Sequence, residues 1–494
     1  MAAYIGIDLG TTYSMVSYLD DTGRPQVIRN AEGQNLTPSC VEIDGNEVTV
    51  GEIARKGLGW NDKVLARFKR DMGTSVTYKV GDKEFTPSEC SVFILKKLLQ
   101  DAKDAIGEVG EAVVTIPANF TNEARVETLS AARLAGLNVK NIVNEPTAAA
   151  LYYVFQNGGT LNGNYAVYDL GGGTFDISII QAKNRDVTVL ASEGVKKLGG
   201  DDFDAALQKI VQKKYKDATG EDLDIHQVYT KTDAEEDKKS LSKREKVNVR
   251  VVKTNLELTR IEFEKEISSL IAQTEMLCEN AVEEAGLKLT DIKDVLLVGG
   301  STRIPCVRDS VKKLFKKNPV TTVNVDEAVV LGASLFSAVK GDQADLNPVQ
   351  KASISKLKVT DVSVGCFGTK AVRGSNHEEY IAVLIKKNEK IPCSVTETFF
   401  TMADNQTEVD CTITQSDAPT DDPKWVNVIW DGALALPNGR RAGQKVDITY
   451  SYDENGTMHA SFVDVATGKE TNTTLSDIAP TVDQKSDINK FIVD

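Results

Sequence analysis

The sequence contains few of the residues that most often perform nucleophilic catalysis or bind transition metals. Its 494 residues include three histidines, His226, His377 and His459, and none has evident partners nearby for such chemistry. The seven cysteines are odd in number, widely scattered and without a Cys-x-x-Cys pair, which argues against a disulfide framework and a zinc site. We therefore expect reduced cysteines and surface histidines.

The chain also lacks a long hydrophobic run and a basic character. No stretch approaches the ~20 uncharged apolar residues of a membrane span, and Asp8 interrupts the first apolar segment, so no secretory leader is expected. The net charge is −14, from 58 basic and 72 acidic residues, which argues against nucleic acid or an anionic membrane as the main partner. These features predict a cytoplasmic protein without a membrane or nucleic-acid partner.

One motif occurs twice. The segment Tyr4–Thr12 has an apolar strand, an aspartate and a Gly-Thr-Thr turn, and Tyr165–Gly173 repeats this order with three glycines. Each turn runs into another apolar strand, and the aspartates are 161 positions apart (169 − 8). This spacing suits two halves of one domain better than a stacked repeat.

Such hairpins suit phosphate binding. Glycines let backbone N–H groups approach an anion closely, and the preceding carboxylates, Asp8 and Asp169, can hold Mg²⁺ through its waters. Two facing hairpins would grip the phosphates of a nucleotide from both sides, whereas either hairpin alone is more simply an ordinary glycine turn. The residues that we expect to donate to phosphate are Gly10, Thr11, Thr12, Gly171, Gly172, Gly173 and Thr174, and we expect Tyr13 to bind the nucleotide beside them.

The chain changes its periodicity once along its length. Residues 1–341 alternate strands with helices, which predicts an α/β domain. Residues 342–361 are rich in Asp, Gln, Asn, Pro, Ser and Lys and predict a linker. Residues 362–494 alternate polar and apolar side chains with period two, as in 409–414 and 446–452, which predicts an antiparallel β-sandwich of short strands.

Five motifs in order resemble those of the seventy-kilodalton heat-shock chaperones (DnaK type). They are Asp8–Ser14, Asn144–Ala150, Asp169–Asp176, Leu198–Asp204 and Gly299–Pro305. Ala403–Gln406 and Asp453–Glu470 extend the resemblance into the peptide-binding β-sandwich of that family. The resemblance implies an actin-like, two-lobed ATPase domain that binds ATP or ADP with Mg²⁺ and hydrolyses ATP.

The resemblance also assigns roles to single residues. Lys69 matches the catalytic lysine, Glu145 and Asp176 match carboxylates that orient water and metal, and Pro117 and Arg125 match a proline switch between domains. With Asp169 and Thr174, the first three form the expected catalytic set. The remaining expected nucleotide-binding residues are Gly199, Gly200, Glu235, Lys238, Lys239, Ser242, Gly299, Gly300, Ser301, Arg303 and Asp326. The expected peptide-binding residues are Ile381, Phe399, Met402, Val409 and Cys411.

Three features depart from the family pattern. Lys239 stands where the family usually has an arginine stacked on adenine, and an ammonium offers no flat stacking surface. Lys358 and Thr360 interrupt the apolar linker 357–361, and after Leu475 only residues 476–494 remain in place of a helical lid.

The sequence thus predicts a monomeric, ATP-hydrolysing chaperone for unfolded or extended polypeptides, with a J-domain co-chaperone and a nucleotide exchange factor as implied partners. Two alternatives remain on the same fold. One is a small-molecule kinase, and the other is a nucleotide-sensing scaffold with little turnover.

Overall fold

The computed structural model describes residues 3–320, 324–374, 377–453, 456–474 and 487–494. The chain divides into two compact units. The first comprises the chain up to Phe120, Glu127–Val359 and the segment at the C-terminal end; the second comprises Thr121–Val126 and the chain from Thr360 through its last β-sandwich strand. The sequence-based division into 1–341 and 362–494 differs from this one, because residues 487–494 belong with the first unit.

Two mixed sheets form the centre of the first unit. The first has the order β11-β10-β1-β2-β3, with β4 paired to β2, and the second contains the run β17-β12-β13-β14. The strands of the first are β1 (Ala3–Asp8), β2 (Tyr13–Leu19), β3 (Pro25–Ile28), β4 (Thr37–Pro38), β10 (Val109–Ile116) and β11 (Asn138–Asn144). Those of the second are β12 (Leu161–Leu170), β13 (Phe175–Asn184), β14 (Asp186–Val195) and β17 (Ile292–Val298).

The two sheets repeat one pattern. In each, a central strand pairs antiparallel with the next strand of its hairpin and parallel with a strand from a later crossover: β1 pairs β2 and β10, and β12 pairs β13 and β17. The buried pattern of β1 (Tyr4, Ile5, Ile7) and of β12 (Tyr165–Leu170) reflects sheets covered on both faces. The repeated sequence motif therefore marks two structurally equivalent strand–turn–strand units.

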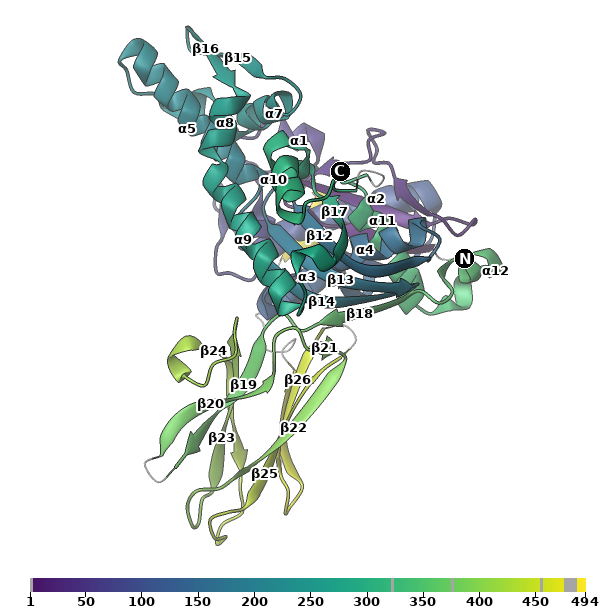
Figure 1. Cartoon of the computed structure of the whole chain (residues 1–494), viewed down its shortest axis with the longest axis vertical. Helices are drawn as coiled ribbons and strands as arrows, with labels where there is room; N and C mark the ends of the chain where they lie inside the picture. The colour runs from purple at the N-terminus through teal and green to yellow at the C-terminus, as the bar shows by residue number, and fades with distance from the viewer. Residues whose placement is uncertain (1–2, 321–323, 375–376, 454–455, 475–486) are drawn as a thin grey trace. The chain divides into compact units, whose positions relative to one another are not determined.

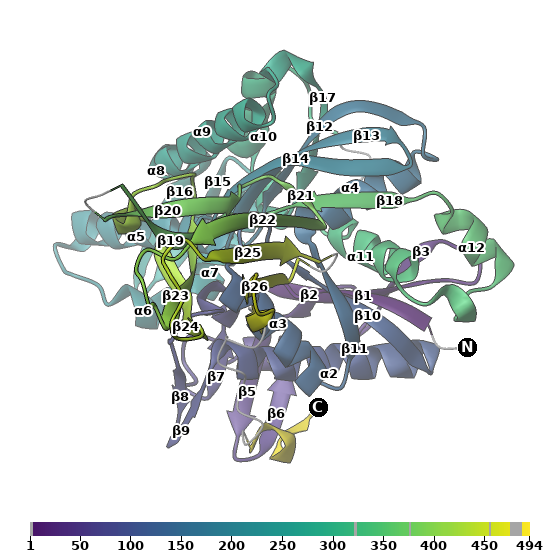
Figure 2. The same ribbon diagram turned by 90° about the horizontal axis from the view of Figure 1, so that it is seen from below.

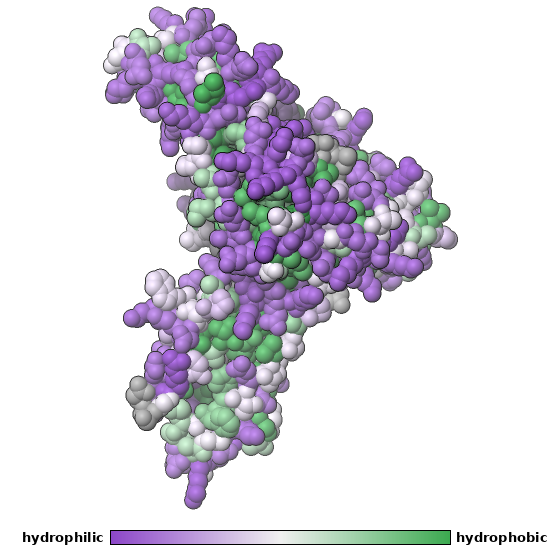
Figure 3. Space-filling model, in the orientation of Figure 1, coloured by the Kyte–Doolittle hydropathy of each residue, from purple (hydrophilic) through white to green (hydrophobic). Residues whose placement is uncertain are grey.

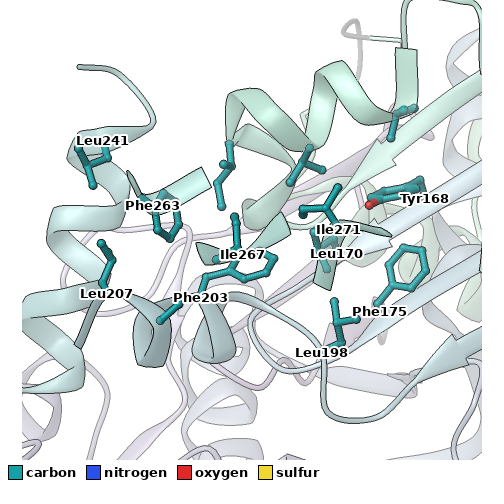
Figure 4. Packing of buried hydrophobic residues seen from close by; sticks show 14 of the residues in the cluster. Tyr168, Leu170, Phe175, Leu198, Phe203, Leu207, Leu241, Phe263, Ile267 and Ile271 are labelled. Carbon is teal, nitrogen blue, oxygen red and sulfur yellow. The ribbon is translucent and has the colours of Figure 1, made fainter. Parts of the chain in front are cut away.

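Helices cover these sheets and extend the unit. The α-helices are α1 (Glu52–Arg55), α2 (Pro87–Ile106), α3 (Asn122–Leu134), α4 (Glu145–Gln156), α5 (Gly200–Thr219), α6 (Ile225–Val228), α7 (Lys231–Leu241), α8 (Arg260–Glu266), α9 (Ser268–Glu284), α10 (Pro305–Phe315), α11 (Ala328–Lys340) and α12 (Pro348–Ile354). Phe175 of the second sheet, Phe203 of α5, Phe263 of α8 and Ile271 of α9 belong to one buried cluster (Figure 4), so the second sheet and these helices share one core.

Smaller sheets complete the first unit. β5 (Cys40–Asp44) lies between β6 (Glu47–Val50) and β7 (Val64–Ala66), and β28 (Ile492–Val493) pairs with the far side of β6. Two further hairpins each form a separate two-stranded sheet: β8–β9 (Tyr78–Val80, Lys83–Phe85) and β15–β16 (Lys246–Val251, Thr254–Thr259). Within the described residues, no helix combines the length and apolar character that a membrane span requires.

The second unit contains two four-stranded antiparallel sheets, as the alternating sequence predicts (Figure 1). Their orders are β20-β19-β23-β24 and β22-β25-β26-β27. The strands are β19 (Cys366–Arg373), β20 (Glu378–Ile385), β22 (Cys393–Phe400), β23 (Glu408–Ser416), β24 (Asn427–Ala435), β25 (Lys445–Tyr452), β26 (Met458–Asp464) and β27 (Lys469–Thr474). Residues of both sheets form one apolar cluster that includes Phe367, Ile413, Tyr450 and Phe462.

The segment expected to be a linker has regular structure. Within 342–361, α12 begins at a capping box in which Asn347 and Gln350 exchange hydrogen bonds, and Pro348 takes the first helical position. The amide of Gln350 donates to the carbonyls of Leu19 and Asp20, at 3.1 and 3.0 Å. Most of this segment is therefore part of the first unit, and β18 (Lys358–Val362) crosses the boundary between the units.

Candidate functional site

The turns of the two repeated hairpins face each other at very short range. A Cβ added to Gly172 would lie 2.0 Å from Oγ1 of Thr12, and one added to Gly173 would lie 2.6 Å from Oγ1 of Thr11. The hydroxyls of one turn thus occupy the space that the missing side chains of the other leave open. Gly10 is equally constrained, since a Cβ there would lie 2.0 Å from the carbonyl oxygen of Tyr13.

The carboxylates at the ends of β1 and β12 are strongly perturbed. Burial, followed by the nearby charge of Glu145, raises the pKa of Asp8 to about 7, against the opposing effects of Lys69 and a 2.9 Å hydrogen bond from Thr115 Oγ1. Burial, followed by Glu145, also raises the pKa of Asp169 well above its usual range. Several carboxylates share one enclosed space, which favours a cation there.

Lys69 lies inside this space. It stands on the 3₁₀ turn Phe68–Asp71 and is 5% exposed, with its Nζ 2.6 Å from Oε1 of Glu145. Glu145 is the first residue of α4, where the helix N-terminus favours a negative charge. Lys69 also lies near both Asp8 and Asp169, whose pKa values it lowers. The buried ammonium thus lies among the carboxylates, where its charge partly offsets theirs.

Asp176 follows the second hairpin and is almost fully buried. Its Oδ1 accepts a 3.2 Å hydrogen bond from the backbone N–H of Asn119, two residues after Pro117. The side-chain amide of Asn119 is enclosed and has no hydrogen-bond partner among the described residues. Asn119 was not among the residues that the sequence singled out, and only its closeness to Pro117 pointed to it.

A second layer of loops encloses the Gly171–Gly173 turn. Backbone N–H groups of Gly200 and Asp201 donate to the carbonyls of Gly171 and Gly172, at 3.0 and 2.8 Å. Ser301 Oγ donates to the Gly171 carbonyl at 2.8 Å, and Lys238 Nζ donates to the Gly200 carbonyl at 2.9 Å.

Two glycines in this layer are required by close contacts. A Cβ on Gly199 would lie 2.7 Å from the backbone of Gly172, and one on Gly299, whose φ is +82°, would lie 2.4 Å from the carbonyl oxygen of Leu170. The predicted residues Gly199, Gly200, Lys238, Gly299 and Ser301 therefore all lie around the second hairpin.

A polar cluster joins the first hairpin to α7. Tyr13 Oη donates to Glu235 at 3.3 Å, and Lys239 Nζ contacts both Glu235, at 2.6 Å, and Tyr13 Oη, at 3.1 Å. Arg55, which sequence reasoning missed, pairs with Glu235 at 3.1 Å. Burial alone would raise the pKa of Glu235, but Lys239 and Arg55 outweigh it and lower that pKa to about 2.

The other residues predicted for the adenosine end lie apart from this cluster. Ser242 caps α7 by donating to the carbonyl of Lys238 at 3.0 Å. Arg303 pairs with Asp326, and a Cβ added to Gly300 would lie 3.5 Å from Oδ1 of Asp326. Gly300, Arg303 and Asp326 form a separate small group after β17, whereas Ser242 stays at the end of α7.

The basic residues beside Lys69 have a different role from Lys69 itself. Arg67 adopts a left-handed backbone, with φ of 65°, and its Nε lies 2.7 Å from Asp201. Arg70 pairs with Asp202 at 3.0 Å. Both acids open α5, so these ion pairs hold the turn carrying Lys69 against the loop at Gly199–Gly200.

The carboxylate cluster fits Mg²⁺ held through water. Within the described residues, no three His, Cys, Asp or Glu side chains are close enough to enclose a metal directly. Mg²⁺ commonly keeps several waters and takes one or two carboxylates together with substrate phosphates. Asp8 and Asp169 would hold such an ion, which would offset the burial and the nearby charge of Glu145 that raise the pKa of both carboxyls.

The residues predicted to bind peptide divide by exposure. Ile381 is buried, and Cys411 is fully enclosed in the apolar cluster of the second unit, so neither faces solvent. Phe399 and Val409 are partly buried against the same cluster, and Met402 is 43% exposed. Phe400, which the sequence prediction omitted, is also exposed. Of the proposed switch pair, Pro117 belongs to the first unit and Arg125 to the segment grouped with the second.

Comparison with known proteins identifies the class. The family model for the Hsp70 protein matches residues 4–80 and 74–494. The chain therefore belongs to the Hsp70 family. It is similar to the chaperone protein DnaK of Thermosipho melanesiensis, with 35% identity over 508 aligned positions that cover 99% of this chain and 82% of the relative.

Proposed function

We propose that the protein is an ATP-dependent chaperone whose first unit, an actin-like ATPase domain of two lobes, hydrolyses ATP, and whose second unit, a β-sandwich, binds extended apolar peptide segments. The observation that carries this proposal is the close apposition of the two hairpin turns around a buried lysine and several carboxylates. Membership of the Hsp70 family supports the same conclusion.

The residues of the cluster suit phosphoryl transfer to water. This reaction needs positioning and charge stabilisation more than covalent help from the protein. The turn residues Gly10–Tyr13 and Gly171–Thr174 would donate to the phosphates, and Lys69 would neutralise charge developing on the γ-phosphate. Glu145 and Asp176 would orient the attacking water, while Asp169 and Thr174 complete the set. Bound Mg²⁺ would supply further charge neutralisation at the phosphates, next to Asp8 and Asp169.

The base and ribose would lie at the outer cluster. Glu235, Lys238, Lys239 and Ser242 on and after α7 are the candidates on one side, and Gly300, Ser301, Arg303 and Asp326 on the other. Lys239 is already engaged by Glu235 and Tyr13, and its ammonium provides no planar surface for stacking. We therefore expect the phosphates to contribute more of the affinity than the base.

Peptide binding would use the partly exposed apolar side chains of the second unit. Phe399, Met402 and Val409 supply apolar surface, and strand edges supply backbone hydrogen bonds. Figure 3 shows apolar patches on the visible face of this unit, whereas the surface around α5 and β15–β16 is mainly hydrophilic. The enclosed Ile381 and Cys411 would support the site from beneath.

The decisive experiment measures ATP turnover with and without an extended apolar peptide. A chaperone of this kind hydrolyses ATP to ADP and phosphate and responds to the peptide, whereas a kinase transfers phosphate to an added small-molecule hydroxyl. Release of inorganic phosphate that the peptide stimulates would support the proposal, and ATP binding without turnover would favour a nucleotide-sensing scaffold. A J-domain co-chaperone and a nucleotide exchange factor are the partners proposed with this function.

A further inference from the structure

The segment Asp487–Asp494, which we call the returning segment, comes after the second unit in the chain but packs on the first. Its strand β28 pairs in parallel with β6, placing Ile492 opposite Glu47 and Val493 opposite Val48. Backbone N–H groups of Ile492 and Asp494 donate to the carbonyls of Asn46 and Val48, at 2.9 and 3.0 Å. Figure 2 shows the chain end beside β5 and β6.

Apolar side chains fix this strand in place. Phe491 is 8% exposed and packs edge-on against Phe85 and Phe93, with ring centroids 5.6 and 5.4 Å apart. Ile488 is 2% exposed and belongs to the same buried cluster as β1, β5 and α2. The pocket for these two side chains is thus part of the core of the first unit.

Charged side chains complete the pocket. The ammonium of Lys83 lies 4.5 Å from the centre of the Phe491 ring, within the range of a cation–π contact. Lys96 on α2 donates to the carbonyl of Ile488 at 3.4 Å. The pocket contacts both the face and the edge of the Phe491 ring, while the β6 edge and Lys96 bind the backbone of the segment. This mode of binding is strand addition with side-chain anchors.

We infer that the edge of β6 and the pocket between Phe85 and Phe93 form a strand-binding site whose ligand is the returning segment of the same chain. The chain therefore leaves the first unit after α12, forms the two sheets of the second unit, and rejoins the first unit at β28. Twelve residues, 475–486 (486 − 475 + 1), join β27 to the returning segment.

A tethered ligand competes with a free one. The returning segment has an effective concentration of about millimolar at its site, so a free peptide of the same sequence must displace it. The affinity of the chain for an added peptide therefore reports whether the returning segment occupies the site.

The test uses the full-length chain, a fluorescein-labelled peptide Asp-Ile-Asn-Lys-Phe-Ile-Val-Asp, and the variant Phe491→Ala. We expect the peptide to bind Phe491→Ala at least about tenfold more tightly than it binds the unmodified chain, because the variant vacates the pocket. The matched control is Ile492→Ala, since Ile492 is 66% exposed and its loss leaves the pocket filled. A peptide with alanine in place of its phenylalanine should not bind.

Hydrogen exchange on the unmodified chain tests the same site without any substitution. The amides of Ile492 and Asp494 should be protected, and an excess of free peptide should accelerate their exchange. Unprotected amides, or equal peptide affinity for the unmodified chain and Phe491→Ala, would overturn the inference. A protein-concentration-dependent dimer that Phe491→Ala dissociates would also overturn it, since the segment would then dock on a second copy.

Discussion

The two repeated hairpins differ in what fills their turns, and the difference explains how they fit together. The β1–β2 turn carries the hydroxyls of Thr11 and Thr12, whereas the β12–β13 turn carries three glycines. An added Cβ at Gly172 would collide with Thr12 and one at Gly173 with Thr11. The threonine side chains of the first turn therefore fit against the glycines of the second turn. This difference in side-chain size lets two structurally equivalent turns approach one site.

The two aspartates that precede these turns, Asp8 and Asp169, differ in the groups that surround them. Asp8 receives a hydrogen bond from Thr115, which lowers its pKa, and that pKa reaches about 7. Burial, followed by the charges of Glu145, Asp176 and Asp8, raises the pKa of Asp169 well above its usual range.

The largest effect is expected from Lys69, which lies beside both aspartates and belongs to neither hairpin. Lys69→Ala should leave ATP binding largely intact and lower single-turnover hydrolysis by about 10²-fold or more, as loss of one group that stabilises the transition state commonly does. Lys63→Ala is the control, since Lys63 forms only an exposed ion pair with Asp44. Turnover within a few-fold of the unmodified protein would remove Lys69 from the mechanism.

The fit between the hairpins is broken most directly at Gly172. Gly172→Ala should weaken nucleotide binding by about tenfold, because overpacking of this kind commonly costs about 1–3 kcal/mol. Gly171→Ala is a close control, since its Cβ would meet nothing nearer than 3.9 Å. Calorimetric titration with ADP measures both affinities, and equal affinities would mean that the turns separate without cost.

The aspartates should couple nucleotide binding to pH. Affinity for ADP with Mg²⁺ should rise as the pH passes through about 7, because the proton on Asp8 must leave before its carboxylate attracts the ion. Asp8→Asn and Asp169→Asn should each lower this affinity by about tenfold, and the double variant by less than the product. Titrations from pH 5.5 to 8.5 test this, and strict additivity would mean that the hairpins do not share a ligand.

The same carboxyl predicts how stability depends on pH. Burial raises the pKa of Asp8 from its ordinary value of 3.8 to about 7, so the folded state binds more protons than the unfolded chain between these two pH values. The ligand-free protein should lose stability as the pH rises through this range, and Asp8→Asn should reduce that loss. Thermal unfolding of both proteins at pH 4.5 and 7.5 measures this difference. A stability that rises with pH in the unmodified protein but not in Asp8→Asn would contradict the prediction.

The smallest effect concerns Lys239, which joins α7 to the first hairpin. Lys239→Arg should tighten ATP binding by a few-fold, because a guanidinium adds a flat surface for the base while retaining a charge beside Glu235. Lys243→Arg, beyond the end of α7, is the control. Unchanged affinity would show that the base does not reach this cluster.

Much of the site follows from local sequence, because strand, carboxylate and turn residues occur together in each hairpin. The missed contacts join distant positions: Asp8 with Thr115, Arg55 with Glu235 and Arg67 with Asp201. No periodicity reports such pairs, because they arise only when the sheets and helices pack. The short helix α12 was different, since Asn347-Pro348-Val349-Gln350 is a capping-box signal that the polar composition of its surroundings concealed.

The returning segment could not be predicted from the sequence at all, since β28 is only two residues long and its partner strand lies more than 400 positions earlier. The pairing also has a consequence for synthesis. The β6 edge and the gap beside Phe85 and Phe93 are made early, but the residues that cover them leave the ribosome after the whole second unit. Until then the nascent chain exposes an open strand edge beside an aromatic pocket, which is a surface open to wrong pairing during translation.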